Sequence, residues 1–100
     1  VVVGAIPVGL DVELAAGNPV RLAAIEDVAG ASPDPLRHWT RIEAVLKADG
    51  RGLRVDPREV SVTNDTAQLG DDQYLLFAPQ LEPGWVVSVA VAAEAPEPED

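Results

Sequence analysis

The side chains that could do chemistry in this chain are few and scattered. His38 is the only histidine, and there is no cysteine. A nucleophilic dyad would have to join His38 to Ser61 or Ser88, both of which lie in predicted strands. Zinc and thiolate sites need several His or Cys ligands, which the chain lacks. We therefore predict no catalytic residue, no resident metal, no cofactor and a non-enzymatic role.

The acidic residues offer one alternative to this prediction. Asp65 lies in one predicted turn, and Asp71 and Asp72 lie in the next. If both turns met at one end of the fold, their carboxylate oxygens would suit a hard cation such as Ca²⁺. Adjacent acids beside a glycine are also ordinary turn residues. The sequence leaves both interpretations open.

The charge is unevenly distributed along the chain. The formal net charge is -10, which disfavours direct binding to nucleic acid or to an anionic membrane. All seven basic residues lie between Arg21 and Arg58, whereas residues 59–100 carry only acids. We expect a soluble protein whose arginine-bearing centre meets an acidic protein partner or packs on the acidic strands of its own chain.

The two ends differ from the middle in composition. Residues 1–9 are predicted to be an apolar N-terminal arm, too short to span a bilayer and without the basic flank of a signal peptide. Such an arm has the character to add a strand to a neighbouring protein. Residues 94–100, EAPEPED, are predicted to be an acidic disordered tail. A single β-rich domain is then expected over 10–93.

Short alternating segments separated by frequent turn signals predict several strands. The segment at 85–92 is apolar on both faces, so it is predicted to lie centrally in a sheet. The predicted strands cover residues 10–15, 20–28, 59–63, 73–78 and 85–92.

The segment at 35–50 supports two interpretations. As a helix, it would begin after Asp34 as N-cap, with Pro35 in the first turn, and end at Gly50. As a strand, Ile42 to Ala48 would alternate before a turn at Asp49 and Gly50. The predicted fold is thus mainly β, a small antiparallel sandwich or barrel of about six or seven strands. The alternative is an α+β fold with one helix at 35–48.

The segment LEPGWVVSVAV at 81–91 resembles the last strands of immunoglobulin-like sandwiches, in which a Leu-x-Pro-Gly turn precedes an alternating strand. The resemblance implies antiparallel pairing for this segment. The paired cysteines of immunoglobulin domains are missing from the chain, so the sequence identifies no family.

These features predict a structural or assembly module, an accessory subunit that self-assembles or docks onto a larger protein complex. Capsid decoration and head–tail joining proteins of phage or virus particles form one class of this size, so a virion is one possible location. The alternative is a sandwich that binds carbohydrate or protein as part of a longer exported chain, with Trp39 and Trp85 as stacking surfaces. The predicted protein interface comprises Val1, Val2, Val3, Ile6, Val8, Arg37, Arg41, Arg51, Arg54 and Arg58.

Overall fold

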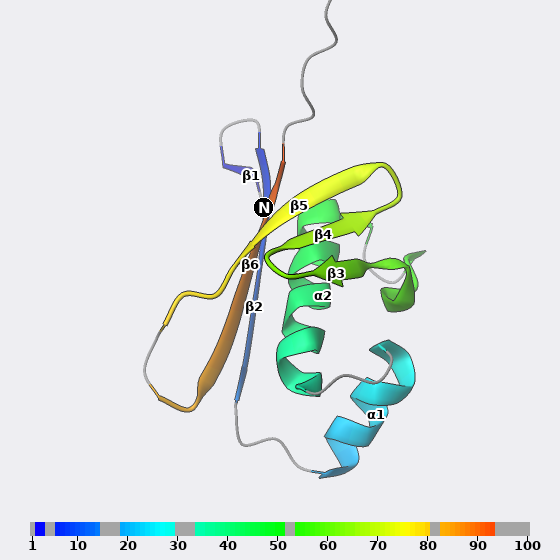
Figure 1. The fold of residues 1–100 in the computed structure, drawn as a ribbon, viewed down its shortest axis with the longest axis vertical. Coiled ribbons are helices and arrows are strands. Elements are labelled where there is room, and N and C mark those ends of the chain that lie inside the picture. The colour runs from blue at the N-terminus through cyan, green and yellow to red at the C-terminus, as the bar shows by residue number, and fades with distance from the viewer. Residues whose placement is uncertain are drawn as a thin grey trace, which may run out of the picture.

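Six strands form one antiparallel sheet in the order β1-β2-β6-β5-β4-β3 (Figure 1). The computed structural model of the chain describes residues 2–3, 6–14, 19–29, 34–51, 54–80 and 83–93. The strands are β1 (Val2–Val3), β2 (Ile6–Leu14), β3 (Ser61–Thr63), β4 (Thr66–Leu69), β5 (Asp72–Phe77) and β6 (Trp85–Ala92). Strand β6 lies between β2 and β5, which confirms the central place predicted from its two apolar faces.

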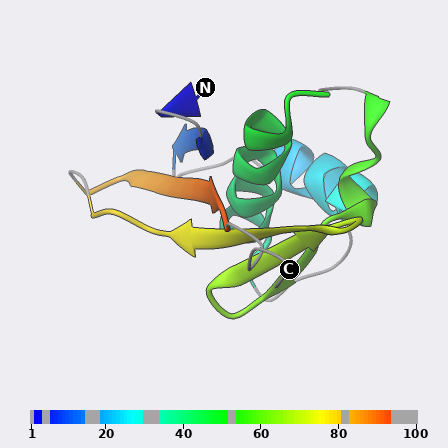
Figure 2. The same cartoon turned by 90° about the horizontal axis from the view of Figure 1, so that it is seen from above.

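Two helices, α1 (Pro19–Ala29) and α2 (Pro35–Asp49), lie on the same side of the sheet (Figure 2). Helix α2 packs on β2 and β6, and α1 packs on α2 and on a short 3-10 helix, η2 (Pro57–Glu59). The mainly β class is confirmed, with a helix in the segment at 35–48. The sheet is open, and in the described ranges no second sheet packs against it. None of the described helices is long and apolar enough to cross a membrane.

Capping decides the segment at 35–50 in favour of the helix. Asp34 Oδ1 accepts a hydrogen bond of 3.2 Å from the Arg37 backbone N–H, and Pro35 follows in the first turn. At the other end, Gly50 adopts a φ of 86° and its N–H donates to the Leu46 carbonyl at 3.0 Å. The strand alternative is therefore wrong, because Asp49-Gly50 ends a helix and makes no hairpin turn.

The strand predicted at 20–28 is also wrong, because these residues belong to α1. Ala23, Ala24 and Glu26 favour helix, and Pro19 suits its first turn. Ile25 is buried in the core between the helices and the sheet. The strand prediction is based on an alternation of apolar residues that spans few positions and includes alanine. The helix propensities of the same residues outweigh this short pattern.

The prediction missed β4, which is short and lies between two tight turns. Asn64 and Gly70 both adopt positive φ, at 53° and 61°, in the turns that lead into and out of β4. Both turns coincide with turn-forming residues in the sequence, TND at 63–65 and LGDD at 69–72. The strand between them has only four residues, with Ala67 and Leu69 buried.

The structure places part of the predicted arm inside the sheet. Residues 6–9 form the first part of β2, with Val8 opposite Val91 and Gly9 opposite Ala90. Strand β1 folds back on β2, so that Val3 lies opposite Ile6. The physical reason is that Ile6 and Val8 extend the alternation of the following residues past Pro7. Val1 and the predicted tail at 94–100 lie outside the described residues.

Helix α2 approaches β2 to backbone contact at Gly9. A Cβ atom on Gly9 would lie 1.9 Å from the Ala44 carbonyl oxygen and 2.5 Å from the Ala48 backbone nitrogen. Both alanines are buried and are themselves small. Glycine is therefore required here by space, since the neighbours are backbone atoms that no side-chain rotation can move.

We expect Gly9→Ala to lower the free energy of unfolding by about 3 kcal/mol, because the new methyl group forces α2 away from the sheet. Urea unfolding followed by circular dichroism measures this loss. Gly70→Ala is the matched control, because a Cβ there meets nothing within 4 Å and the positive φ is the only cost. That cost is about 1 kcal/mol. A Gly9→Ala variant as stable as Gly70→Ala would contradict the close approach.

Candidate functional site

Strand β2 turns its polar side chains toward α2 and its apolar side chains away from it. Residues directly opposite in antiparallel strands share a face, and Asp11 lies opposite Ser88. The Ser88 hydroxyl lies 2.8 Å from the Thr40 hydroxyl of α2, so this is the helix side. By alternation, Leu10 and Val12 point to the other side of the sheet.

That other side carries one contiguous apolar patch, which we call the open face. It consists of the β2, β5 and β6 side chains that point away from α2: Val8, Leu10, Val12, Leu14, Leu75, Phe77, Trp85, Val87, Val89 and Val91. Seven large hydrophobic side chains are exposed in the described part of the chain, and six belong to this face. Their exposed fractions run from 39% to 58%. Clustered exposure of this kind marks interaction surfaces, whereas scattered exposure does not.

The centre of the open face is recessed. Val87, on the central strand β6, is only 6% exposed, although it is not part of the core between helices and sheet. Val89, the next residue of this face on the same strand, is half-buried. Their neighbours on the flanking strands, Leu10 and Phe77, are large and half-exposed. The face therefore has a low row at Val87 and Val89 between two higher rows, and the exposed Trp85 lies at one end of this low row.

The same side of the sheet carries no charge among the described strand residues. The charged strand residues Asp11, Glu13 and Asp72 all belong to the helix side, although 24% of the chain is charged. Beyond the apolar patch, the side away from α2 continues with uncharged polar residues: Ser61, Thr63, Thr66, Gln68 and Gln73. An apolar centre with a polar margin on one flank is the usual composition of a protein–protein interface.

A polar cluster lies on the helix side of the sheet. Asp11 is buried, and its Oδ1 accepts a hydrogen bond of 2.8 Å from Lys47 Nζ. Its Oδ2 is buried and has no hydrogen-bond partner in the structure. The Lys47 side chain is half-exposed. The hydrogen bond to Asp11 raises the pKa of Lys47, although partial burial of the ammonium opposes this.

The hydroxyl pair of this cluster is structural. Thr40 Oγ1 donates to the Arg37 carbonyl at 2.9 Å, so its single proton is already used. The Ser88 hydroxyl must therefore be the donor in its 2.8 Å contact with Thr40. Ser88 is buried beneath α2, whereas a nucleophile must meet its substrate. This pair instead fixes α2 against β6.

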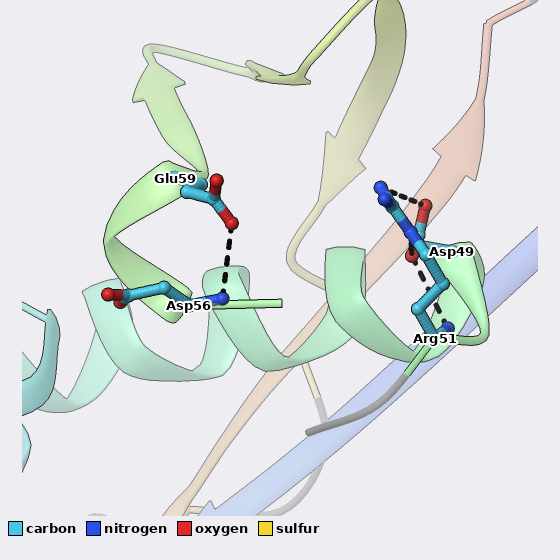
Figure 3. Close-up of polar contacts among 4 residues, drawn as sticks. All are labelled: Asp49, Arg51, Asp56 and Glu59. Atoms are coloured by element: carbon cyan, nitrogen blue, oxygen red, sulfur yellow. Dashed lines mark hydrogen bonds and ion pairs between the residues drawn. The ribbon is translucent and has the colours of Figure 1, made fainter. Parts of the chain in front are cut away.

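Three of the predicted interface arginines contact acids of their own chain. Arg51 binds the Asp49 carboxylate through Nε at 2.7 Å and Nη2 at 3.2 Å (Figure 3). This hydrogen bonding lowers the pKa of Asp49. Arg58 Nη2 lies 3.3 Å from Asp56 Oδ2, and the Asp56 backbone N–H donates to Glu59 in the cap of η2.

The third of these arginines is Arg41, whose Nη2 lies 3.8 Å from Oδ1 of Asp65 in the turn between β3 and β4. Burial of the guanidinium, followed by the neighbouring charge of Arg37, lowers the pKa of Arg41. Arg37 and Arg54 are exposed and line two different pockets. The structure thus distributes the predicted arginines over several places, with Arg37 next to the Trp85 end of the open face, whereas Val8 is part of that face and Ile6 shares its side of β2.

The predicted grouping of Asp65 with Asp71 and Asp72 is wrong. Asp65 precedes β4, and the other two follow it, so the strand separates them by roughly 13 Å or more. Among the described residues, no three His, Cys, Asp or Glu side chains lie close enough to hold a metal ion.

The two tryptophans line different pockets, one away from the open face and one at the end of it that includes Trp85 and Val87. A pocket of about 760 Å³ between α1, α2 and η2 is lined by Trp39, Leu46 and Arg54, among others. A pocket of about 390 Å³ beside the start of β6 is lined by Arg37, Pro79 and Trp85, among others. Trp39 and Trp85 therefore make no joint stacking platform.

No protein-family model matches the chain, and neither a curated protein nor a solved structure matches it. The function must therefore be argued from the geometry alone.

We expect Lys47→Met to cost about 2 kcal/mol of unfolding free energy, because it leaves the buried Asp11 carboxylate without its donor. In an Asp11→Val background the same change should cost less than about 0.5 kcal/mol, since no carboxylate is left unpaired. A double-mutant cycle by urea unfolding measures the difference. Equal costs in both backgrounds would show that the contact does not couple the two side chains.

The same pair of proteins gives a pH test. Because folding raises the pKa of Lys47, its contribution to stability is complete below the ordinary value of 10.5 and is lost as pH rises through the folded-state value. The stability difference between the natural chain and Lys47→Met should therefore shrink above pH 10.5. A difference that stays constant into this range would contradict the assignment.

Proposed function

We propose that this protein is a non-enzymatic assembly module that binds a protein surface through the open face of its sheet. The observation that carries the proposal is the clustering of six exposed large hydrophobic side chains on one charge-free face. Burial of apolar surface contributes about 25 cal/mol per Å². Covering this face would therefore be a substantial source of binding free energy.

The direction of the β2 side chains supports the proposal, because the apolar ones point away from α2 and the polar ones point toward it. A shift of one residue would bring Leu10, Val12 and Leu14 to the helix side and Asp11 to solvent. The chain instead buries the Asp11 carboxylate, with one oxygen unpaired, and leaves the leucines exposed. This arrangement is unfavourable for an isolated domain and becomes favourable when a partner covers the face.

The nature of the face also favours protein over other partners. None of its described strand residues is basic, and the chain has a net charge of -10. An accessory subunit of a phage or virus particle is the class that we propose, on the grounds of size and composition.

A second candidate is a ligand-binding role for the pocket between α1, α2 and η2. Its volume of about 760 Å³ lies within the range typical of small-molecule sites. Its lining combines the Trp39 ring with the charged residues Glu43, Lys47 and Arg54. Loss of glycan or peptide binding on Trp39→Ala, with assembly unaffected, would favour this role.

Photo-crosslinking in the source cells tests the assembly proposal. A crosslinking side chain replaces Val12, which is 39% exposed on the open face, or Val28, which is 40% exposed on α1 and lines the pocket of the second candidate. We expect a discrete adduct from position 12, several-fold stronger than any adduct from position 28. The mass of the adduct reports whether the partner is this chain or another protein.

The adduct must also depend on the rest of the face. Phe77→Gln, on the neighbouring part of the open face, should abolish the adduct from position 12 without unfolding the protein, because Phe77 is half-exposed. Equal adducts from positions 12 and 28, or an adduct that persists in Phe77→Gln, would overturn the proposed docking surface.

A further inference from the structure

We infer that the open face is covered by a second copy of this chain, with the two sheets packed face to face about a two-fold axis. The inference rests on the proposed function and identifies the protein that binds the open face. Three features support it: the composition of the rest of the chain, the absence of charge and the relief of the face.

The remaining segments of the chain offer no cover for the face. Outside the described ranges, the internal segments hold two to four residues each, and residues 94–100 are EAPEPED. None combines the length and apolar composition needed to cover three strands. The cover must therefore come from another chain or from sequence beyond these residues.

The charge pattern favours a copy of the same chain. In a two-fold contact every charge near the axis meets its own duplicate, so an acidic chain self-associates most easily through a surface whose centre is free of charge. The side of the sheet away from α2 meets this condition, because its described strand residues are all uncharged. A different protein partner would ordinarily be steered and oriented by complementary charges, which this face does not offer.

The relief of the face makes it complementary to itself. The low row of Val87 and Val89 on β6 runs between the higher rows of β2 and β5. If one copy is displaced sideways by one strand, the β2 row of each copy, which includes Val12, lies over the β6 row of the other. A two-fold axis relates these two contacts, and the side chains interdigitate as they do in a β-sandwich.

The size of the face sets the expected strength. Three strands about 4.8 Å apart, each about eight residues long, cover a plane of about 14 by 26 Å. This plane of about 360 Å² is less than half of the about 800 Å² per partner that stable interfaces bury, so the contact is expected to be weak. We expect a reversible dimer that dissociates in the micromolar range.

Salt distinguishes a second copy from a basic partner. Two copies of net charge -10 repel each other, and salt screens this repulsion. The dimer should therefore tighten several-fold between about 0.05 and 0.5 M NaCl, a range over which the Debye length falls severalfold. Binding to a basic partner would weaken over the same range.

Sedimentation equilibrium of the full chain, from about 1 to 500 µM, tests the inference; this interval spans the micromolar range expected of a small interface. We expect a monomer–dimer equilibrium that Val12→Gln weakens at least about tenfold. Val28→Gln is the matched control, because it removes an equally exposed valine outside the open face. It should leave the equilibrium unchanged. Circular dichroism establishes that both variants are folded.

Three results would overturn the inference. These are a chain that stays monomeric at every concentration and salt, a dimer that Val12→Gln leaves intact, and a dimer that salt weakens. A monomer that still gives a position-specific adduct with another protein in cells would overturn only the second-copy inference, and the proposed docking face would stand. Deleting residues 1–8 is unsuitable as a test, because it removes Ile6 and Val8 from β2.

Discussion

Contact between α2 and β2 at Gly9 fixes which side chains of β2 point inward. Only a residue without a Cβ fits against the Ala44 and Ala48 backbone, so position 9 must face the helix. Strand alternation then places Asp11 on the helix side and Leu10 and Val12 on the other. The exposed apolar face and the buried carboxylate are therefore two consequences of one close approach.

The helix side tolerates this orientation because α2 supplies polar partners where β2 and β6 need them. Lys47 Nζ donates a hydrogen bond to Asp11, and the Thr40 hydroxyl oxygen accepts one from the Ser88 hydroxyl. Larger buried side chains of the core, Tyr74 and Leu76, lie farther along the sheet on β5. The core is thus asymmetric, with small and polar contacts under β2 and larger apolar contacts under β5.

Local signals in the sequence account for much of the fold but not for the candidate site. The caps at Asp34 and Gly50 and the alternation of β6 are short-range patterns, so they could be recognised without the structure. The orientation of β2 could not, because it depends on Gly9 meeting a helix that starts 26 positions later (35 minus 9). The alternation of Leu10, Val12 and Leu14 was visible in the sequence, but an apolar stripe alone does not say whether helix or solvent lies over it.

The pairing of β2 with β6 has a consequence for the order in which the protein folds. Val8 lies opposite Val91, 83 positions away along the chain (91 minus 8), whereas β3, β4 and β5 are joined by tight turns and α2 is closed by its own caps. Distant pairings carry a larger entropic cost of loop closure and form slowly. We expect the hairpins of β3, β4 and β5 to form first and the pairing of β2 with β6 to complete the sheet last. During synthesis, β2 is made early and stays unpaired until β6 has been made. Its leucines are therefore exposed for the longest time, and this strand depends most on protection from aggregation.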